Sequence, residues 1–281
     1  MRRLCFTADG SFQGKKASAL LTHIGCSAEI IKKLKEGGLL INGKSAFTVQ
    51  ILKENDVVEL VFPDESPDAE PVFSERVGLL YKDGDIAVAD KPPFMPIHQS
   101  PGHYGDTLAN HFAALFPEHR FRAIDRLDKN TSGLCAVALN KLSAAILCKN
   151  RPQKLYYAAV KGNIPPFGRI ELPIAREEGS LIKRRVCENG QRAVTEYMTV
   201  KEKDGLKLLE IRLETGRTHQ IRVHLAYLGF PLLGDGLYGG DCRPINRQAL
   251  HCGKMRLIHP ITGERIEFSS PLPEDMARLF D

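Results

Sequence analysis

The sequence lacks tryptophan, long apolar runs, and any pair of cysteines spaced Cys-x-x-Cys. Without an apolar run of about 18 residues, no helix is expected to span a membrane. The first residues, MRRLCFTADGSFQ, carry charge without a following apolar core, so no secretory signal is expected. The seven cysteines are scattered and odd in number, which favours reduced thiols in the cytoplasm over a disulfide framework or a zinc site.

Charge is distributed unevenly along the 281 residues. The formal net charge is +5, from 39 basic and 34 acidic side chains, and the 43% of hydrophobic residues is typical of a globular protein. Seven lysines lie between residues 15 and 53, whereas residues 63–71, PDESPDAEP, are acidic and contain three prolines. A segment of that kind is typical of an extended linker. We therefore predict a small basic domain at 1–62, a linker at 63–75 and a large domain at 76–281.

Periodicity predicts helices and a short sheet in the small domain. Apolar residues recur at helical spacing in 17–25 and 28–38, and the second run ends in a glycine pair. Residues 39–42 and 44–52 are predicted as strands joined by an Asn42-Gly43 turn, and 56–62 as a further strand. The result is a small α/β domain. Its second helix carries three lysines that fit either an RNA-binding role or a solvated helix face, namely Lys32, Lys33 and Lys35.

The large domain is predicted to mix strands and helices. Helical spacing favours helices at 106–116, with Asp106 as the N-cap, and at 142–149. Several other segments alternate polar and apolar residues, which favours an α+β fold with a mixed, mainly antiparallel sheet and helices packed on it. The predicted strands are two within 78–92, then 121–124, 133–140, 154–162, 192–200 and 206–215.

Three familiar motifs are present by spacing but fail on context. Residues 38–45, GLLINGKS, match a phosphate loop, yet strand-forming residues occupy the cradle and follow it where a helix is required. Residues 234–239 match GxGxxG, but Pro244 discourages the helix that a dinucleotide site needs. His219 and His224 lack the Glu of HExxH, so structural or RNA-contacting histidines are favoured over zinc ligands. No metal is predicted.

The segment from Asp125 to Leu134, DRLDKNTSGL, is dense in reactive residues and lies between two predicted strands. Its two carboxylates could form an acid and base pair for cleaving a glycosidic bond. Such pairs normally lie on opposite sides of the bond, whereas these are three residues apart in one loop. The alternative is a turn stabilised by Asp, Asn, Thr and Ser side chains, and the residues alone leave both open.

Three segments in order resemble motifs of the RluA-type family of RNA pseudouridine synthases. RLDKNTSGL is similar to the family's active-site motif, which usually begins with His where this chain has Asp125. Residues 154–158, KLYYA, and 215–224, TGRTHQIRVH, resemble the next two motifs, and Gly229 to Gly239 continues as GxPxxGDxxYG. The likeness covers about residues 76–281 and ends with LH at 250–251 and HP at 259–260. More weakly, LKEGGLLING and DVVEL resemble the small RNA-binding domain of ribosomal small-subunit protein four.

The resemblance implies an isomerase of the pseudouridine synthase fold that converts uridine to pseudouridine. Asp128 matches the catalytic carboxylate, which acts as nucleophile at the anomeric carbon or as base at the neighbouring ribose position. Arg222 matches the cation paired with it, and Tyr156 the aromatic residue that stacks on the uracil. The reaction has no redox step and no external group donor, so no cofactor is expected. The remaining site residues are assigned to RNA contacts: Arg126, which would enter the stack that a flipped uridine vacates, Arg217, His219 and the three lysines Lys32, Lys33 and Lys35.

RNA is the predicted partner, with large-subunit ribosomal RNA first and transfer RNA second, and the protein is expected to act as a monomer. The departure at Asp125 concerns loop packing and RNA fit, because the reacting carboxylate is Asp128. A non-catalytic RNA-binding protein remains an alternative, although it need not keep Asp128, Tyr156 and Arg222 together. A nucleotide-hydrolysing enzyme would depend only on the GKS match.

Overall fold

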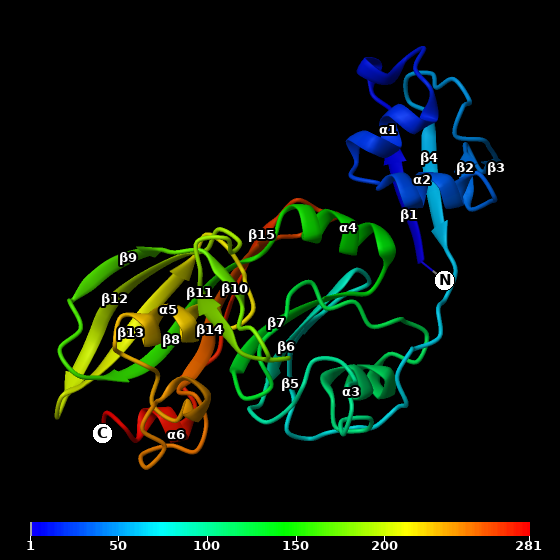
Figure 1. Ribbon diagram of the computed structural model, residues 1–281. Helices are drawn as coiled ribbons and strands as arrows, with labels where there is room; N and C mark the ends of the chain where they lie inside the picture. The colour runs from blue at the N-terminus through cyan, green and yellow to red at the C-terminus, as the bar shows by residue number, and fades with distance from the viewer. Residues whose placement is uncertain (1) are drawn as a thin grey trace.

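Four antiparallel strands form the sheet of the N-terminal body in the computed structural model, which describes residues 2–281 (Figure 1). Their spatial order is β1-β4-β2-β3, and Asn42 and Gly43 between β2 and β3 both have positive φ, as the predicted tight turn requires. Strand β1 was not predicted. The bounds are β1 Arg2–Thr7, β2 Leu39–Ile41, β3 Lys44–Ser45 and β4 Val57–Phe62.

Two helices cover this sheet, α1 at Ala17–His23 and α2 at Ala28–Leu34, with the short helix η1 at Gly10–Phe12 before them. Both helices confirm the prediction. Ser27 begins α2 by accepting a hydrogen bond from the Ile30 N–H, at 3.3 Å. The helices bury apolar side chains against the sheet, so the small body has a core of its own, centred on Leu20, Leu21, Ile30, Leu34, Val58 and Leu60.

The predicted strand at 44–52 is wrong beyond Ser45. Residues 46–52 form a loop whose carbonyl groups cap the first turn of α1. The Ala17 N–H donates to Gln50 O and the Ser18 N–H donates to Thr48 O, both at 2.8 Å. These oxygens satisfy helix N–H groups that would otherwise lack partners, so the segment serves the helix in place of a sheet.

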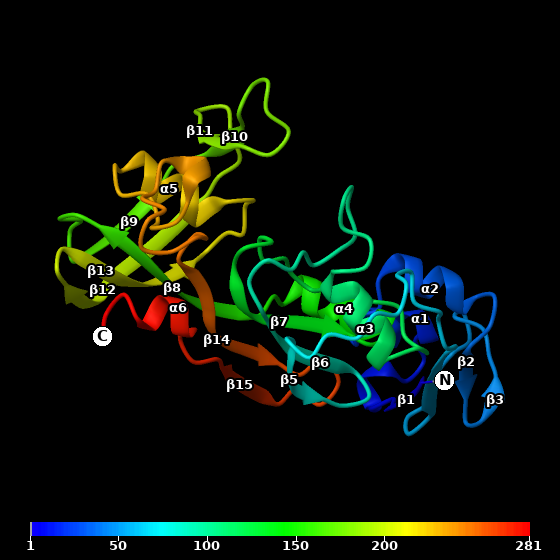
Figure 2. The same cartoon turned by 90° about the horizontal axis from the view of Figure 1, so that it is seen from below.

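A nine-stranded sheet forms the body that follows, and it confirms the mixed, mainly antiparallel prediction. Its order is β5-β6-β7-β14-β8-β13-β12-β9, with β15 paired to β14, and only β7 and β14 run parallel. Its strands are β5 Gly78–Lys82, β6 Ile86–Lys91, β7 Ser132–Ala138, β8 Gln153–Lys161, β9 Phe167–Glu171, β12 Val194–Lys203, β13 Leu206–Leu213, β14 Leu250–Ile258 and β15 Arg265–Ser269. A separate hairpin, β10 Ile174–Arg176 with β11 Arg184–Val186, projects from this body (Figure 2).

Helices pack on the large sheet as predicted: α3 Leu108–Leu115, α4 Lys141–Lys149, α5 Gln220–Tyr227 and α6 Glu274–Ala277, with the short helix η2 at Gly236–Tyr238. The N-cap of α3 is Thr107, so the prediction of Asp106 is wrong by one residue. Thr107 and Asn110 form a reciprocal capping box, which Asp106 is too early to make. The predicted strand at 121–124 is also wrong, since only Ala123 bridges Val137 before the chain turns into the loop at 125.

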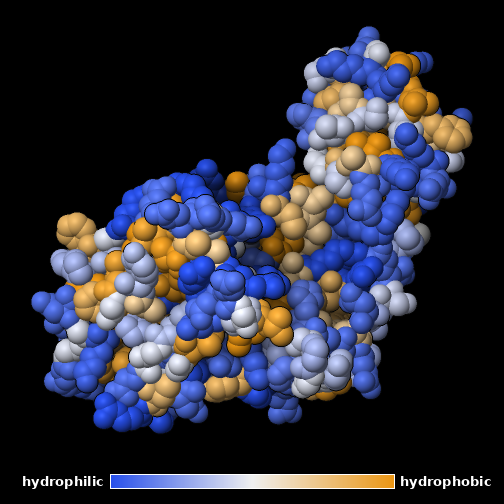
Figure 3. All heavy atoms as spheres, in the orientation of Figure 1, coloured by the Kyte–Doolittle hydropathy of each residue, from blue (hydrophilic) through white to orange (hydrophobic). Residues whose placement is uncertain are grey.

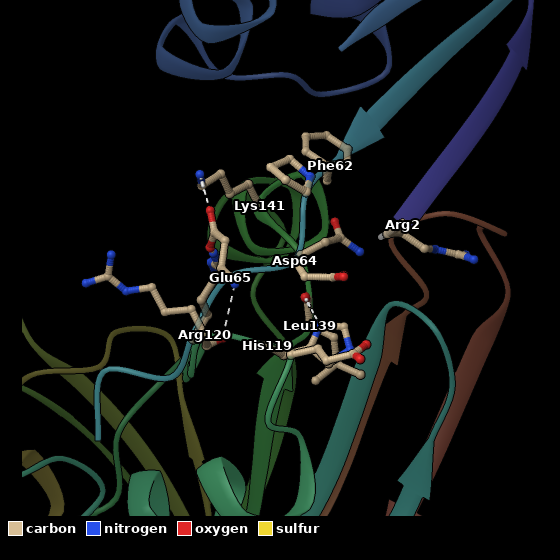
Figure 4. A pocket seen from close by; sticks show the side chains of 12 residues that line it. Arg2, Phe62, Asp64, Glu65, His119, Arg120, Leu139 and Lys141 are labelled. Atoms are coloured by element: carbon tan, nitrogen blue, oxygen red, sulfur yellow. Dashed lines mark hydrogen bonds and ion pairs between the residues drawn. The ribbon is translucent and has the colours of Figure 1, made fainter. Parts of the chain in front are cut away.

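Residues 63–77 form neither helix nor strand and lie along the large body. The Glu65 N–H donates to Glu118 O at 3.0 Å, and the Glu65 carboxylate contacts both Arg122 and Lys141. Figure 4 shows these side chains around the junction, with Arg2 and Phe62 reaching it from the small body. Ion pairs of the acidic segment therefore bind it to the surface it crosses.

Helix α4 joins the two bodies, because its outer face completes the core of the small one. Leu142 is fully buried among small-body side chains, and Ile146 lies against Gly25. At the start of α4, the Arg2 guanidinium donates two hydrogen bonds to Asp85, at 3.0 and 2.6 Å, and the Asn140 amide donates a third at 2.8 Å. The small body is a separate lobe in the surface view, but its core is shared (Figure 3).

Candidate active site

The loop at 125–131 carries Asp128 and is held by hydrogen bonds from its own backbone and from a buried lysine. The Thr131 N–H donates to Asp128 O at 3.0 Å, and the Met95 N–H to Lys129 O at 3.1 Å. The fully buried Lys91 ammonium donates to three carbonyls, those of Pro92, Met95 and Lys129. Burial lowers the pKa of Lys91 to about 8, so this cation is retained at neutral pH by the carbonyls around it.

The loop enters strand β7 through Gly133, where two backbones come very close. Gly133 has a φ of +110°, and a Cβ there would lie 2.3 Å from Cys252 O on β14. Only glycine fits both conditions. Cys252 pairs with Gly133 on one side and with Tyr156 of β8 on the other. Tyr156 therefore lies level with the end of the loop and two strands away, roughly 10 Å at the usual strand spacing.

Arg222 is buried between two carboxylates. Its Nη1 donates to Asp128 Oδ2 at 3.0 Å, while Nε and Nη2 donate to Asp235 at 2.7 and 2.8 Å. The side chain of Asp235 is 1% exposed and that of Arg222 is 7% exposed, whereas Asp128 is 25% exposed. Burial lowers the pKa of Arg222, but the two carboxylates outweigh it and hold the pKa above its usual value. One fixed cation thus faces a partly open carboxylate.

His219 and Tyr238 complete the surroundings of Asp128. His219 precedes α5 with a left-handed φ of 58°, which places its Nε2 3.8 Å from Asp128 Oδ2. Its Nδ1 lies 2.8 Å from the Tyr238 hydroxyl, which accepts a hydrogen bond from the Arg184 N–H at 2.9 Å. The Tyr238 ring centroid lies 5.0 Å from Arg222 Cζ, a cation–π distance. Burial lowers the pKa of His219, and the nearby Asp128 only partly opposes this.

Comparison with known proteins identifies the family. Residues 85–227 match the family described as RNA pseudouridylate synthase. The chain is 39% identical over 270 residues to the RNA pseudouridine synthase YjbO of Bacillus subtilis, covering 92% of this chain and 95% of the relative. The chain belongs to the RNA pseudouridylate synthase family. It is therefore an isomerase that acts on RNA, and the alternative of a non-catalytic RNA-binding protein is not supported.

Other relatives agree with this family. The chain is 34% identical over 296 residues to ribosomal large subunit pseudouridine synthase D of Xanthomonas campestris, covering 96% of this chain and 89% of that protein. A solved structure of human RNA pseudouridylate synthase domain containing 1 superposes with a TM-score of 0.60 at 29% identity, covering 72% of this chain and 86% of that chain. The predicted pseudouridine synthase fold is thereby confirmed.

The sequence-predicted residues of this synthase fall into two groups. Asp128, Arg222 and His219 meet at one point, and Tyr156 lies in the same sheet two strands from the loop. Arg126 and Arg217 are exposed, and Arg217 donates to Arg192 O at 3.1 Å. The three lysines Lys32, Lys33 and Lys35 are exposed on α2 of the small body, where Lys33 also pairs with Glu29 at 3.0 Å.

Sequence reasoning gave no role to Asp235, Tyr238 and Lys91. The first two stand in the GDxxYG part of a motif that the sequence displays, so their position was visible although their contacts with Arg222 were not. Lys91 precedes a proline pair in an apolar strand, where a buried lysine is an unusual residue. That mismatch was the available signal.

One group of side chains within residues 2–281 has the composition of a metal site: Asp83, Asp85 and His259. Their atoms already have protein partners. Asp85 accepts from Arg2 and Asn140, and His259 Nε2 lies 2.7 Å from Asp83 Oδ2. The group belongs to the domain junction rather than to the surroundings of Asp128. Of the helices described between residues 2 and 281, none has the length and apolar character needed to cross a bilayer.

Proposed function

We propose that this synthase converts uridine to pseudouridine in structured RNA with Asp128 as its reacting carboxylate, and that it is of the RluA type. The observation that carries the proposal is the Asp128–Arg222–Asp235 arrangement. Arg222 supplies a fixed positive charge that favours the ionised carboxylate when RNA covers the site. Arg222 and His219 both approach Oδ2, which leaves Oδ1 as the oxygen to meet the ribose.

The reaction cleaves the bond between the anomeric carbon and ring nitrogen 1, turns the uracil, and rejoins it through carbon 5. Asp128 either attacks the anomeric carbon or removes a ribose proton at the adjacent position. Tyr156 would stack on the turned uracil and assist removal of the proton at carbon 5. Burial raises the pKa of Tyr156 well above its usual value, so the phenol is neutral when it contacts the base.

A uridine within stacked RNA must be flipped out before Asp128 can reach it. Arg126 is two residues from Asp128 and exposed, so its planar guanidinium is available to occupy the vacated stack. Arg217 would contact phosphate near the site. The small body would act as an RNA-binding domain like that of ribosomal small-subunit protein four, through the exposed lysines of α2. Ribosomal large-subunit RNA is the substrate we favour, in line with the name of the Xanthomonas relative, and transfer RNA is second.

The test is conversion of uridine in ribosomal RNA transcripts by purified protein, followed by tritium release from carbon 5. Asp128→Asn keeps the shape of the side chain and its acceptor for Arg222 but removes the reactive charge, so we expect loss of product with RNA binding nearly unchanged. Asp68→Asn is the matched control, because Asp68 forms a half-exposed ion pair with Arg120, far along the chain from the loop. Turnover by Asp128→Asn within tenfold of the wild type would refute the assignment.

A further inference from the structure

Asp125, the residue at which the active-site motif departs from its usual His, has a specific partner in this fold. Its Oδ1 accepts a hydrogen bond from Lys154 Nζ at 2.6 Å. The same ammonium donates to Leu134 O at 3.0 Å. One side chain of β8 is therefore bonded to the start of the catalytic loop and to β7 at once.

This ion pair is largely removed from solvent. The side chain of Lys154 is 7% exposed and that of Asp125 is 19% exposed. A buried ammonium without a counter-charge carries a large desolvation penalty, which a neutral residue at 125 would leave uncompensated. Burial by itself would lower the pKa of Lys154, but the Asp125 carboxylate holds that pKa well above its usual value. The cation and its carboxylate partner therefore require each other.

The pair joins the chain segments that carry the two groups of the reaction. Asp125 stands three residues before Asp128 in the loop, and Lys154 stands two residues before Tyr156 on β8. Residues two apart on a strand point to the same face, so Lys154 and Tyr156 share one face of the sheet. At its other end the loop is held by backbone bonds at Lys129 and Thr131. Asp125 supplies the side-chain connection at the near end.

We propose that Asp125 is a positioning residue, whose ion pair with Lys154 sets the placement of Asp128 relative to Tyr156. The inference rests on the proposed roles of those two residues in the reaction. Displacement of a reacting group by about 1 Å can cost roughly 100-fold in rate. Loss of this connection should therefore slow the chemical step while leaving RNA affinity nearly unchanged, because neither side chain is placed on the exposed RNA-facing surface.

A double-mutant cycle with Asp125→Asn and Lys154→Met tests the proposal. Each single variant removes one charge, and the double variant leaves no unpaired buried charge. We expect each single and the double to slow single-turnover conversion at saturating RNA by a similar factor, roughly 30-fold or more. RNA affinity should change less than threefold. Asp125→Glu, which keeps the carboxylate, should recover most of the rate, and Asp68→Asn should have no effect.

Urea unfolding of every variant allows rates to be expressed per folded molecule. If a single variant does not fold, the double variant decides, since a folded double variant with the wild-type rate would overturn the proposal. Losses that multiply in the double variant would also overturn it, because the two residues would then act independently. A wild type without product, or an active Asp128→Asn, would instead refute the proposed function itself.

Discussion

Leu142 and Leu147 lie on the same helix, α4, and give a sharp test of how the two bodies are joined. Both side chains are fully buried. Leu142 belongs to the core of the small body, whereas Leu147 belongs to the core of the large one. Truncation to alanine removes the same atoms from each, so a difference between the variants reports only which core each residue completes.

We expect Leu142→Ala to weaken the small body by about 2–5 kcal/mol, the usual cost of a cavity left by a buried leucine. At 1.4 kcal/mol for each factor of ten, amide exchange in α1, α2 and β4 should accelerate roughly 30-fold to several-thousand-fold. Exchange in β6 and β7 of the large body should change far less. Leu147→Ala should show the opposite distribution.

Native-state hydrogen exchange measured by mass spectrometry resolves these segments, and limited proteolysis within residues 63–75 provides a second measure. Leu142→Ala should be cut faster there, because separation of the bodies would expose the acidic segment. The shared-core description would be refuted if Leu142→Ala left exchange in α1 and α2 at the wild-type rate. It would also be refuted if both variants loosened the two bodies equally.

Three further predictions concern the RNA surface, a strand contact and pH. Replacing Lys32, Lys33 and Lys35 by Gln should reduce the salt slope of RNA binding by up to about 0.7–0.9 per phosphate contact, with the saturated rate nearly unchanged; an unchanged slope would mean that these lysines are only solvated. Gly133→Ala should lower the free energy of unfolding by at least roughly 1–3 kcal/mol in urea titrations, because its Cβ would overlap Cys252 O; a wild-type midpoint would contradict the close approach. Burial lowers the pKa of His224 and His251 below the usual 6.5, so the unfolded chain binds protons first as pH falls. The urea midpoint should therefore decrease from pH 7.5 to 5.5, by up to roughly 1.4 kcal/mol of stability per histidine per pH unit below 6.5, and a flat midpoint would be evidence against it.

Local sequence determined the elements whose signals are complete within a few residues. Helices α1 and α2 followed from apolar spacing and a terminal glycine pair, and the turn at Asn42-Gly43 from the positive φ that both residues tolerate. Alternation along the large domain was enough to predict a mainly antiparallel sheet, because side chains of a strand face opposite sides. The motifs also named Asp128 and Arg222, although their roles in the reaction remain predictions.

Tertiary structure decided the features that depend on partners distant in the chain. Residues 46–52 have the composition of a strand, but their carbonyl groups satisfy the N–H groups of α1, and nothing local announces that competition. The burial of Arg222 between Asp128 and Asp235 joins residues 94 and 13 positions apart, so its fixed charge exists only in the folded chain. The same holds for Asp125, which is one more acidic residue in the sequence and becomes the counter-charge of a buried lysine only when β8 lies beside the loop.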